Sequence, residues 1–143
     1  MSRRHGVRIS SRCEYGLRAM IYLARTAGDE PTPLTEIARR EDMPTAFLER
    51  ILARLREGGL VASTRGASGG YRLSRPAGAI SVADIVTAIE GPLSLVGCLP
   101  DEGGCARAGS CASQAVWRRL DSAINRALGD ISLDELSVEA ITT

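Results

Sequence analysis

Apolar side chains recur at helical spacing near the start of the chain. Leu17, Met20, Ile21 and Ala24 follow the i, i+3, i+4, i+7 rule of an amphipathic helix. The pattern predicts a helix over residues 12–26, ended by turn residues at 28–33.

Two further apolar stripes follow, with a tight turn between them. The first is short, at Ile37 and Ala38, and the second is formed by four residues, Leu48, Ile51, Leu52 and Leu55. Pro44 suits the first turn of the second helix, and Gly58 and Gly59 suit its end. A short helix, a turn and a longer helix predict a helix-turn-helix.

The next segment, LVAST-RGASGG-YRL at residues 60–73, has the composition of two short strands around a glycine-rich turn. A hairpin directly after a helix-turn-helix predicts a winged helix. Arg65 stands at the base of the turn, and Gly69 and Gly70 let backbone N–H groups approach phosphates without a side chain between. The alternative is an ordinary solvated hairpin.

The second half of the chain is also helical. Ser81 and Asp84 have the spacing of a capping box at the start of SVADIVTAIE, and Gly91 ends this predicted helix. An apolar stripe then predicts a long helix over 111–128, and Ser132 with Glu135 caps a last short helix. The stripe comprises six residues, Val116, Trp117, Leu120, Ile124, Ala127 and Leu128.

The long helix needs a partner for its stripe, either the rest of its own chain or a second copy. We expect a homodimer, because two winged helices related by a two-fold axis read the two halves of a palindromic operator.

The predicted fold is mainly α, a winged helix-turn-helix with a small β-hairpin wing and a long C-terminal dimerisation helix. The DNA-binding region spans residues 7–76, and residues 77–143 hold a loop (91–111), the dimerisation helix (111–128) and the last helix.

Charge is divided unevenly along the chain. The total of 18 basic and 17 acidic residues is nearly balanced, but residues 1–75 hold 14 arginines against 8 acids and residues 76–143 hold 4 against 9. The net charge is therefore +6 in the predicted DNA-binding half and −5 in the other. A basic winged helix favours double-stranded DNA as the partner.

Candidate base contacts lie on the second helix of the pair, away from its apolar stripe. Thr45 is near the N-terminus of this helix, where base edges are reached. Arg50 suits guanine O6 and N7, Glu49 suits cytosine N4, and Arg54 suits a phosphate or solvent. The alternative is an ordinary exposed face.

The length of 143 residues fits one domain with a folded core. No run of 18 apolar residues occurs, and the basic N-terminus has no apolar segment behind it, so we expect no membrane span and a cytoplasmic location. A lone histidine, His5, and the lack of a phosphate-binding loop or dinucleotide fingerprint argue against an enzyme.

Three of the four cysteines, Cys98, Cys105 and Cys111, lie in a glycine-rich stretch between the fourth and fifth predicted helices. Their spacing differs from the C-x2-C pairs usual for structural zinc. It leaves open an iron-sulfur cluster, zinc, or thiols that are redox-active or idle. Cys13 continues the stripe of the first helix, where a thiol acts as a small hydrophobe.

Several segments together resemble the winged-helix iron-sulfur regulators of the IscR/NsrR family, over about residues 7–128. They are RISSRCEYGLRAM, FLERILARLREGGLVASTRGASGGYRLSRP, ISVADIVTAIEGP and the loop cysteines followed by VW. The resemblance implies a homodimeric transcription regulator whose operator binding is controlled by a [4Fe-4S] or [2Fe-2S] cluster that senses iron, redox or nitric oxide status. It makes Cys98, Cys105 and Cys111 the ligands, and places Glu49, Arg50 and Arg65 at DNA-contact positions.

The sequence departs from this family at the fourth ligand. A histidine three residues after the last cysteine completes the site in some members, and Gln114 holds that position here. Other members use a carboxylate near the start of the first helix of the partner subunit, which Glu14 matches; the alternative for Glu14 is a surface pair with Arg18. The rival function is a cluster-free regulator of the same fold, switched by thiol oxidation or a partner protein.

Overall fold

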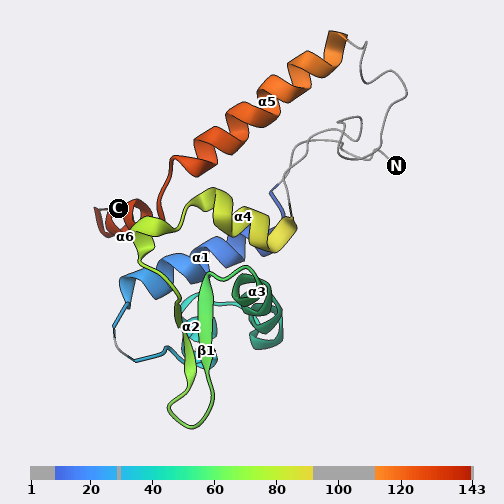
Figure 1. Ribbon diagram of the computed structural model, residues 1–143. Coiled ribbons are helices and arrows are strands. Elements are labelled where there is room, and N and C mark those ends of the chain that lie inside the picture. Colours follow the sequence, from blue (N-terminus) through green and yellow to red (C-terminus); the bar gives the residue numbers. More distant parts are fainter. Residues whose placement is uncertain (1–8, 29, 92–111, 143) are drawn as a thin grey trace.

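The computed structural model describes residues 9–28, 30–91 and 112–142 (Figure 1). The described part is mainly helical, with one two-stranded antiparallel sheet. Its elements in chain order are α1 (Ser11–Arg25), α2 (Leu34–Arg40), α3 (Thr45–Glu57), β1 (Val61–Thr64), β2 (Gly70–Leu73), the 3-10 helix η1 (Ala77–Ala79), α4 (Val82–Glu90), α5 (Ala112–Gly129) and α6 (Leu133–Thr142). The predicted winged helix-turn-helix is confirmed. None of the described helices is long and apolar enough to cross a membrane.

Side-chain caps mark the beginning of α1 and α4. The Ser10 hydroxyl accepts the N–H of Cys13 at 3.2 Å and starts α1. Ser81 and Asp84 form the predicted capping box of α4, each side chain accepting the other's backbone N–H, at 3.1 and 3.0 Å. At the other end, Gly91 stops α4 with a φ of +83°, a conformation that favours glycine.

The core forms where α1 meets α3, α4 and α6. Eleven large side chains are almost completely buried: Met20, Ile37, Leu48, Ile51, Leu52, Leu55, Leu60, Ile80, Ile85, Ile89 and Leu133. The most buried face of α1 contains Cys13, Gly16, Met20 and Leu23, whereas Leu17 of the predicted stripe is only partly buried. The face is rotated from the prediction because α1 is covered from several sides.

Gly16 allows the helices to approach closely. A Cβ atom at this position would lie 2.2 Å from Cδ1 of Ile89 in α4 and 3.2 Å from Cγ2 of Ile51 in α3. A larger residue would force the buried Ile89 side chain, or the helices themselves, to shift. Gly16 therefore fixes α1, α3 and α4 against one another.

Helix α5 extends away from this body (Figure 1). Three large apolar side chains on it remain exposed, Val116 by 57%, Trp117 by 38% and Leu120 by 41%. The predicted long helix is confirmed in position, and much of its stripe is not covered by the described part of the chain.

Candidate nucleic-acid interface and metal-binding region

The predicted recognition helix α3 has one buried and one exposed face. Its four predicted apolar residues are buried, and Thr45, Glu49 and Arg50 are exposed. The helix begins after Pro44 without a side-chain cap, so its first N–H groups are free of side-chain partners at the end where Thr45 lies. Such an end favours an approaching phosphate. The exposed face has the residue types that a base-reading surface needs.

Arg54, the fourth residue predicted on this helix, has an internal contact. Its Nη1 donates to the backbone carbonyl of Ile89 in α4 at 3.2 Å. Arg54 also lines a cavity of about 530 Å³ together with Arg12, Phe47, Arg50 and Glu57, among others. The side chain therefore lies between the recognition helix and the end of α4.

The hairpin pairs Val61 with Leu73 and Thr64 with Gly70, and Arg65 is exposed where its turn begins. Both predicted glycines have a structural role within the chain. A Cβ atom on Gly69 would lie 2.2 Å from the carbonyl oxygen of Thr64, and one on Gly70 would lie 2.2 Å from that of Thr32. Whether the glycines also let phosphates approach stays a prediction.

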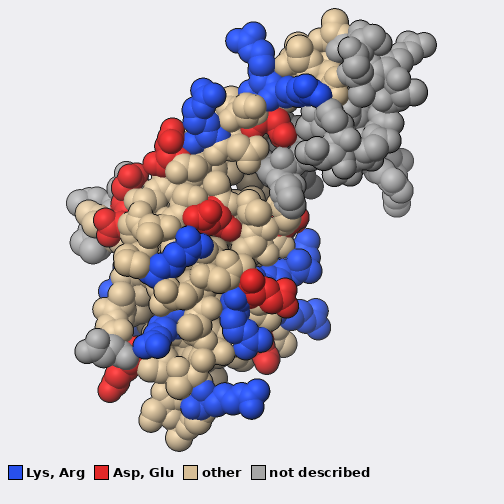
Figure 2. Space-filling view, viewed as in Figure 1, with Lys and Arg blue, Asp and Glu red and all other residues tan. Residues whose placement is uncertain are grey.

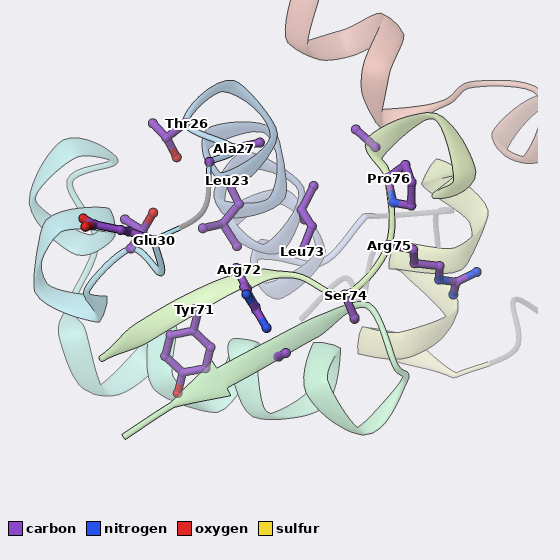
Figure 3. A pocket seen from close by; sticks show the side chains of 14 residues that line it. Leu23, Thr26, Ala27, Glu30, Tyr71, Arg72, Leu73, Ser74, Arg75 and Pro76 are labelled. Atoms are coloured by element: carbon purple, nitrogen blue, oxygen red, sulfur yellow. The ribbon is translucent and has the colours of Figure 1, made fainter. Parts of the chain in front are cut away.

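The hairpin is fixed to the body close to its turn. Thr32, just before α2, exchanges two backbone hydrogen bonds of 2.8 Å with Tyr71. A hollow of about 450 Å³ lies beside this junction, and Figure 3 shows Leu23 of α1 and Leu73 of β2 near its centre, whereas Arg75 points away. This anchor, one pair from the end of the ladder at Thr64 and Gly70, holds the Arg65 end of the hairpin in a defined direction relative to α3.

The turn between α2 and α3 is held by α1. Arg18 donates to the backbone carbonyl of Glu41 and pairs with its carboxylate at 3.6 Å. The next residue, Asp42, has a φ of 51°, which aspartate tolerates better than most residues. No local pattern predicts this contact of Arg18, because its partner lies 23 residues away.

Of the predicted metal ligands, Cys98, Cys105 and Cys111 lie outside the described residues. Glu14 is described and is exposed on the first turn of α1. Arg18 is paired with Glu41, and within the described part Glu14 forms no ion pair. Gln114, which replaces the family's histidine, is 5% exposed near the start of α5.

Cys13 is buried in the core, as predicted. Burial, and secondarily the nearby Glu90 carboxylate, raise the pKa of its thiol above the ordinary value. A neutral buried thiol is a poor metal ligand, because metals bind the thiolate. Cys13 is therefore not a candidate metal ligand, unlike Cys98, Cys105 and Cys111.

Charged side chains of both signs cover the surface. Figure 2 shows arginines over the hairpin and along the upper part of α5, whereas acidic residues gather toward α6 and the lower end of α5. The basic side chains at the hairpin lie on the winged-helix unit itself. This distribution favours a polyanion as the partner of that unit.

An exposed helix beside an anchored, arginine-bearing hairpin is the arrangement of a winged-helix DNA-binding protein. The family and the relatives described next are transcription regulators and not enzymes. The chain belongs to the Rrf2 family of iron-dependent transcriptional regulators, whose pattern matches residues 9–139.

Relatives and solved structures agree with this family. The chain is 38% identical over 130 residues to the HTH-type transcriptional regulator IscR of Xenorhabdus nematophila, covering 91% of this chain and 79% of that protein. CymR of B. subtilis, described as a global cysteine regulator, superposes with a TM-score of 0.78 at 36% identity, covering 94% and 98% of the two chains. IscR of T. potens superposes with a TM-score of 0.73 at 34% identity, covering 94% and 89%.

Proposed function

We propose that this regulator is a homodimer whose operator binding is controlled by an iron-sulfur cluster held by Cys98, Cys105 and Cys111. The observation that carries the proposal is this group of three cysteines between α4 and α5, in a chain of an iron-dependent family. Thiolates in this number suit an iron-sulfur cluster of the [4Fe-4S] or [2Fe-2S] type. When bound, the cluster would be the part of the protein whose state changes with iron supply, redox state or nitric oxide.

Glu14 of the partner subunit is the proposed fourth ligand. Its exposure and its lack of an ion pair in the described part leave the carboxylate available. Three thiolates and one carboxylate fit a cluster iron site, and an oxygen ligand there is exchanged more easily than a thiolate. Such a site suits a sensor better than an electron carrier.

The exposed stripe of α5 is the proposed dimer surface. Val116, Trp117 and Leu120 lie on the part of the helix that extends from the body. Two copies joined here present two recognition helices and two hairpins, which suits a palindromic operator. In this arrangement Thr45, Glu49 and Arg50 face bases, and Arg65, Gly69 and Gly70 face phosphates.

The test is anaerobic purification with iron and sulfide counted per chain. We expect a coloured protein, and we expect the colour to be lost in Cys98→Ala, Cys105→Ala and Cys111→Ala but kept in Cys13→Ala. Glu14→Ala should form a cluster that is lost sooner in air, whereas the exposed-acid control Glu30→Ala should not. Full iron, sulfide and absorbance in Cys105→Ala would rule out the proposed ligand set.

A cluster-free thiol switch is the second candidate, favoured by the close structural likeness to CymR as well as to IscR. In that case the same three thiols would be oxidised and reduced without metal. The wild-type protein would then purify without iron or sulfide, and its operator affinity would change on treatment with an oxidant.

A further inference from the structure

The last turn of α4 is capped by the recognition helix. The final carbonyl groups of any helix have no partner within it, and α4 has no basic residue in its own last turn. Arg54 of α3 donates to one of these groups, the carbonyl of Ile89, at 3.2 Å. Its positive charge also interacts favourably with the negative end of the helix dipole.

The same turn is fixed by α1. The Ser10 hydroxyl donates to the Glu90 carboxylate, and Arg12 pairs with that carboxylate at 3.4 Å. The Ile89 side chain is fully buried against Gly16, where no Cβ would fit. The end of α4 therefore cannot shift without disturbing either α1 or the Arg54 contact.

This turn lies between the two functional regions of the chain. Gly91 ends α4, and Cys98 follows seven residues later in the sequence. On the other side, Arg54 is one helical turn from Arg50, on the exposed face of α3. Figure 1 shows α3 beside the end of α4 that precedes this segment. One side chain thus joins the recognition helix to the helix end that leads to the cysteines.

We propose that Arg54 is a positioning residue that couples the state of the cysteine segment to the recognition helix through the Ile89 carbonyl. The proposal rests on the proposed function, and it replaces the sequence-based interpretation of Arg54 as a phosphate contact. A displacement of the last turn of α4 moves the Arg54 anchor, and with it the orientation of α3.

The two roles of Arg54 predict different results in Arg54→Ala. If Arg54 couples, the ratio of operator affinities of the cluster-loaded and apo forms falls to within about two-fold of one, from a wild-type ratio in the usual range of about 5 to 150. If it binds a phosphate, both forms weaken equally, the ratio stays, and the slope of log affinity against log salt loses about 0.9 for each half-site that the dimer occupies. The second result would overturn the proposal.

The matched control is Arg56→Ala, because Arg56 lies on the same helix and makes one side-chain hydrogen bond, to Ser63 of β1 at 3.2 Å. It should keep the wild-type ratio. Arg54→Lys, which keeps a charged donor, should restore much of the ratio, and Arg54→Gln answers the same question should Arg54→Ala fail to fold.

Iron and sulfide are counted in every preparation. A wild-type protein without a cluster would refute the proposed function, whereas a loaded Arg54→Ala with an unchanged ratio would refute the coupling alone.

Discussion

Helices α3 and α5 have similar apolar stripes but different surroundings. Leu52 and Leu55 of α3 are fully buried by neighbours from the same chain, whereas Leu120 of α5 is 41% exposed. The periodicity of a sequence predicts that a face will be covered, but not by which molecule. The difference shows that a single chain covers the α3 stripe, whereas the described part of the chain leaves much of the α5 stripe uncovered, which supports the proposed dimer surface.

The largest effect is expected from Leu52→Ala. Removing a fully buried leucine leaves a cavity, and we expect a loss of about 2–5 kcal/mol in the free energy of unfolding. Leu120→Ala is the matched control; at protein concentrations where the proposed dimer is dissociated we expect it to cost less, because the side chain is 41% exposed in the single chain. Urea denaturation measures both, and equal losses would contradict the comparison.

Leu120→Asp tests whether the exposed stripe of α5 is the dimer surface. A charge in the α5 stripe should give a folded monomer, and losing the second recognition helix should lower operator affinity by about 10²- to 10⁴-fold. Sedimentation and footprinting measure the two effects. Ser122→Asp, at a position outside the stripe on the same helix, should remain dimeric. A dimeric Leu120→Asp with a full footprint would assign the dimer surface elsewhere.

Within the winged-helix unit, Arg50 and Arg65 should differ in kind. Arg50→Ala should cost about 1–3 kcal/mol at its preferred operator and relax the sequence preference, because a base contact is lost. Arg65→Ala should weaken all sites alike and reduce the salt slope by about 1 for each half-site, because one phosphate contact is lost in each subunit. Binding to a set of operator variants at several salt concentrations separates the two, and identical behaviour would contradict these roles.

The smallest effect concerns Cys13, whose substitution by alanine should cost roughly 1 kcal/mol. Burial, with a smaller effect of Glu90, raises the pKa of its thiol in the folded chain. The resulting stability is fully present below the ordinary thiol pKa and is lost as pH rises through the raised value, because the unfolded chain ionises first.

Urea denaturation of wild type and Cys13→Ala at pH 7.5 and 9.5 checks this sign, since the loop thiols are common to both proteins. The difference between the two proteins should be smaller at pH 9.5. A larger difference at the higher pH would show that Cys13 is ionised in the folded chain.

Much of the fold was predictable because its signals are local. The helix predicted over 12–26 is Ser11–Arg25 and that over 111–128 is Ala112–Gly129, since apolar spacing and caps involve neighbouring residues. Ser81, Asp84 and Gly91 bound α4 as predicted. Pro44 lies one position earlier than predicted: it is the N-cap of α3 and is not within the first turn of this helix.

The contacts that position the candidate site were not predictable. Thr32 pairs with Tyr71, and Arg54 with the Ile89 carbonyl, across 39 and 35 residues of sequence. No periodicity or cap signals a hydrogen bond between distant segments, so the sequence suggests only a phosphate or solvent contact for Arg54 and does not reveal its bond to Ile89. The reason for Gly16 also depends on three helices meeting, which a pattern within one helix does not contain.

The measurement that tests control by the cysteine segment most directly is the operator affinity of one anaerobic wild-type preparation before and after removal of its cluster, with iron counted in both samples. We expect the two affinities for the same palindromic operator to differ by at least about five-fold, the lower end of the usual range for coupled sites. Equal affinities of iron-loaded and iron-free dimers would contradict control of DNA binding by the cluster.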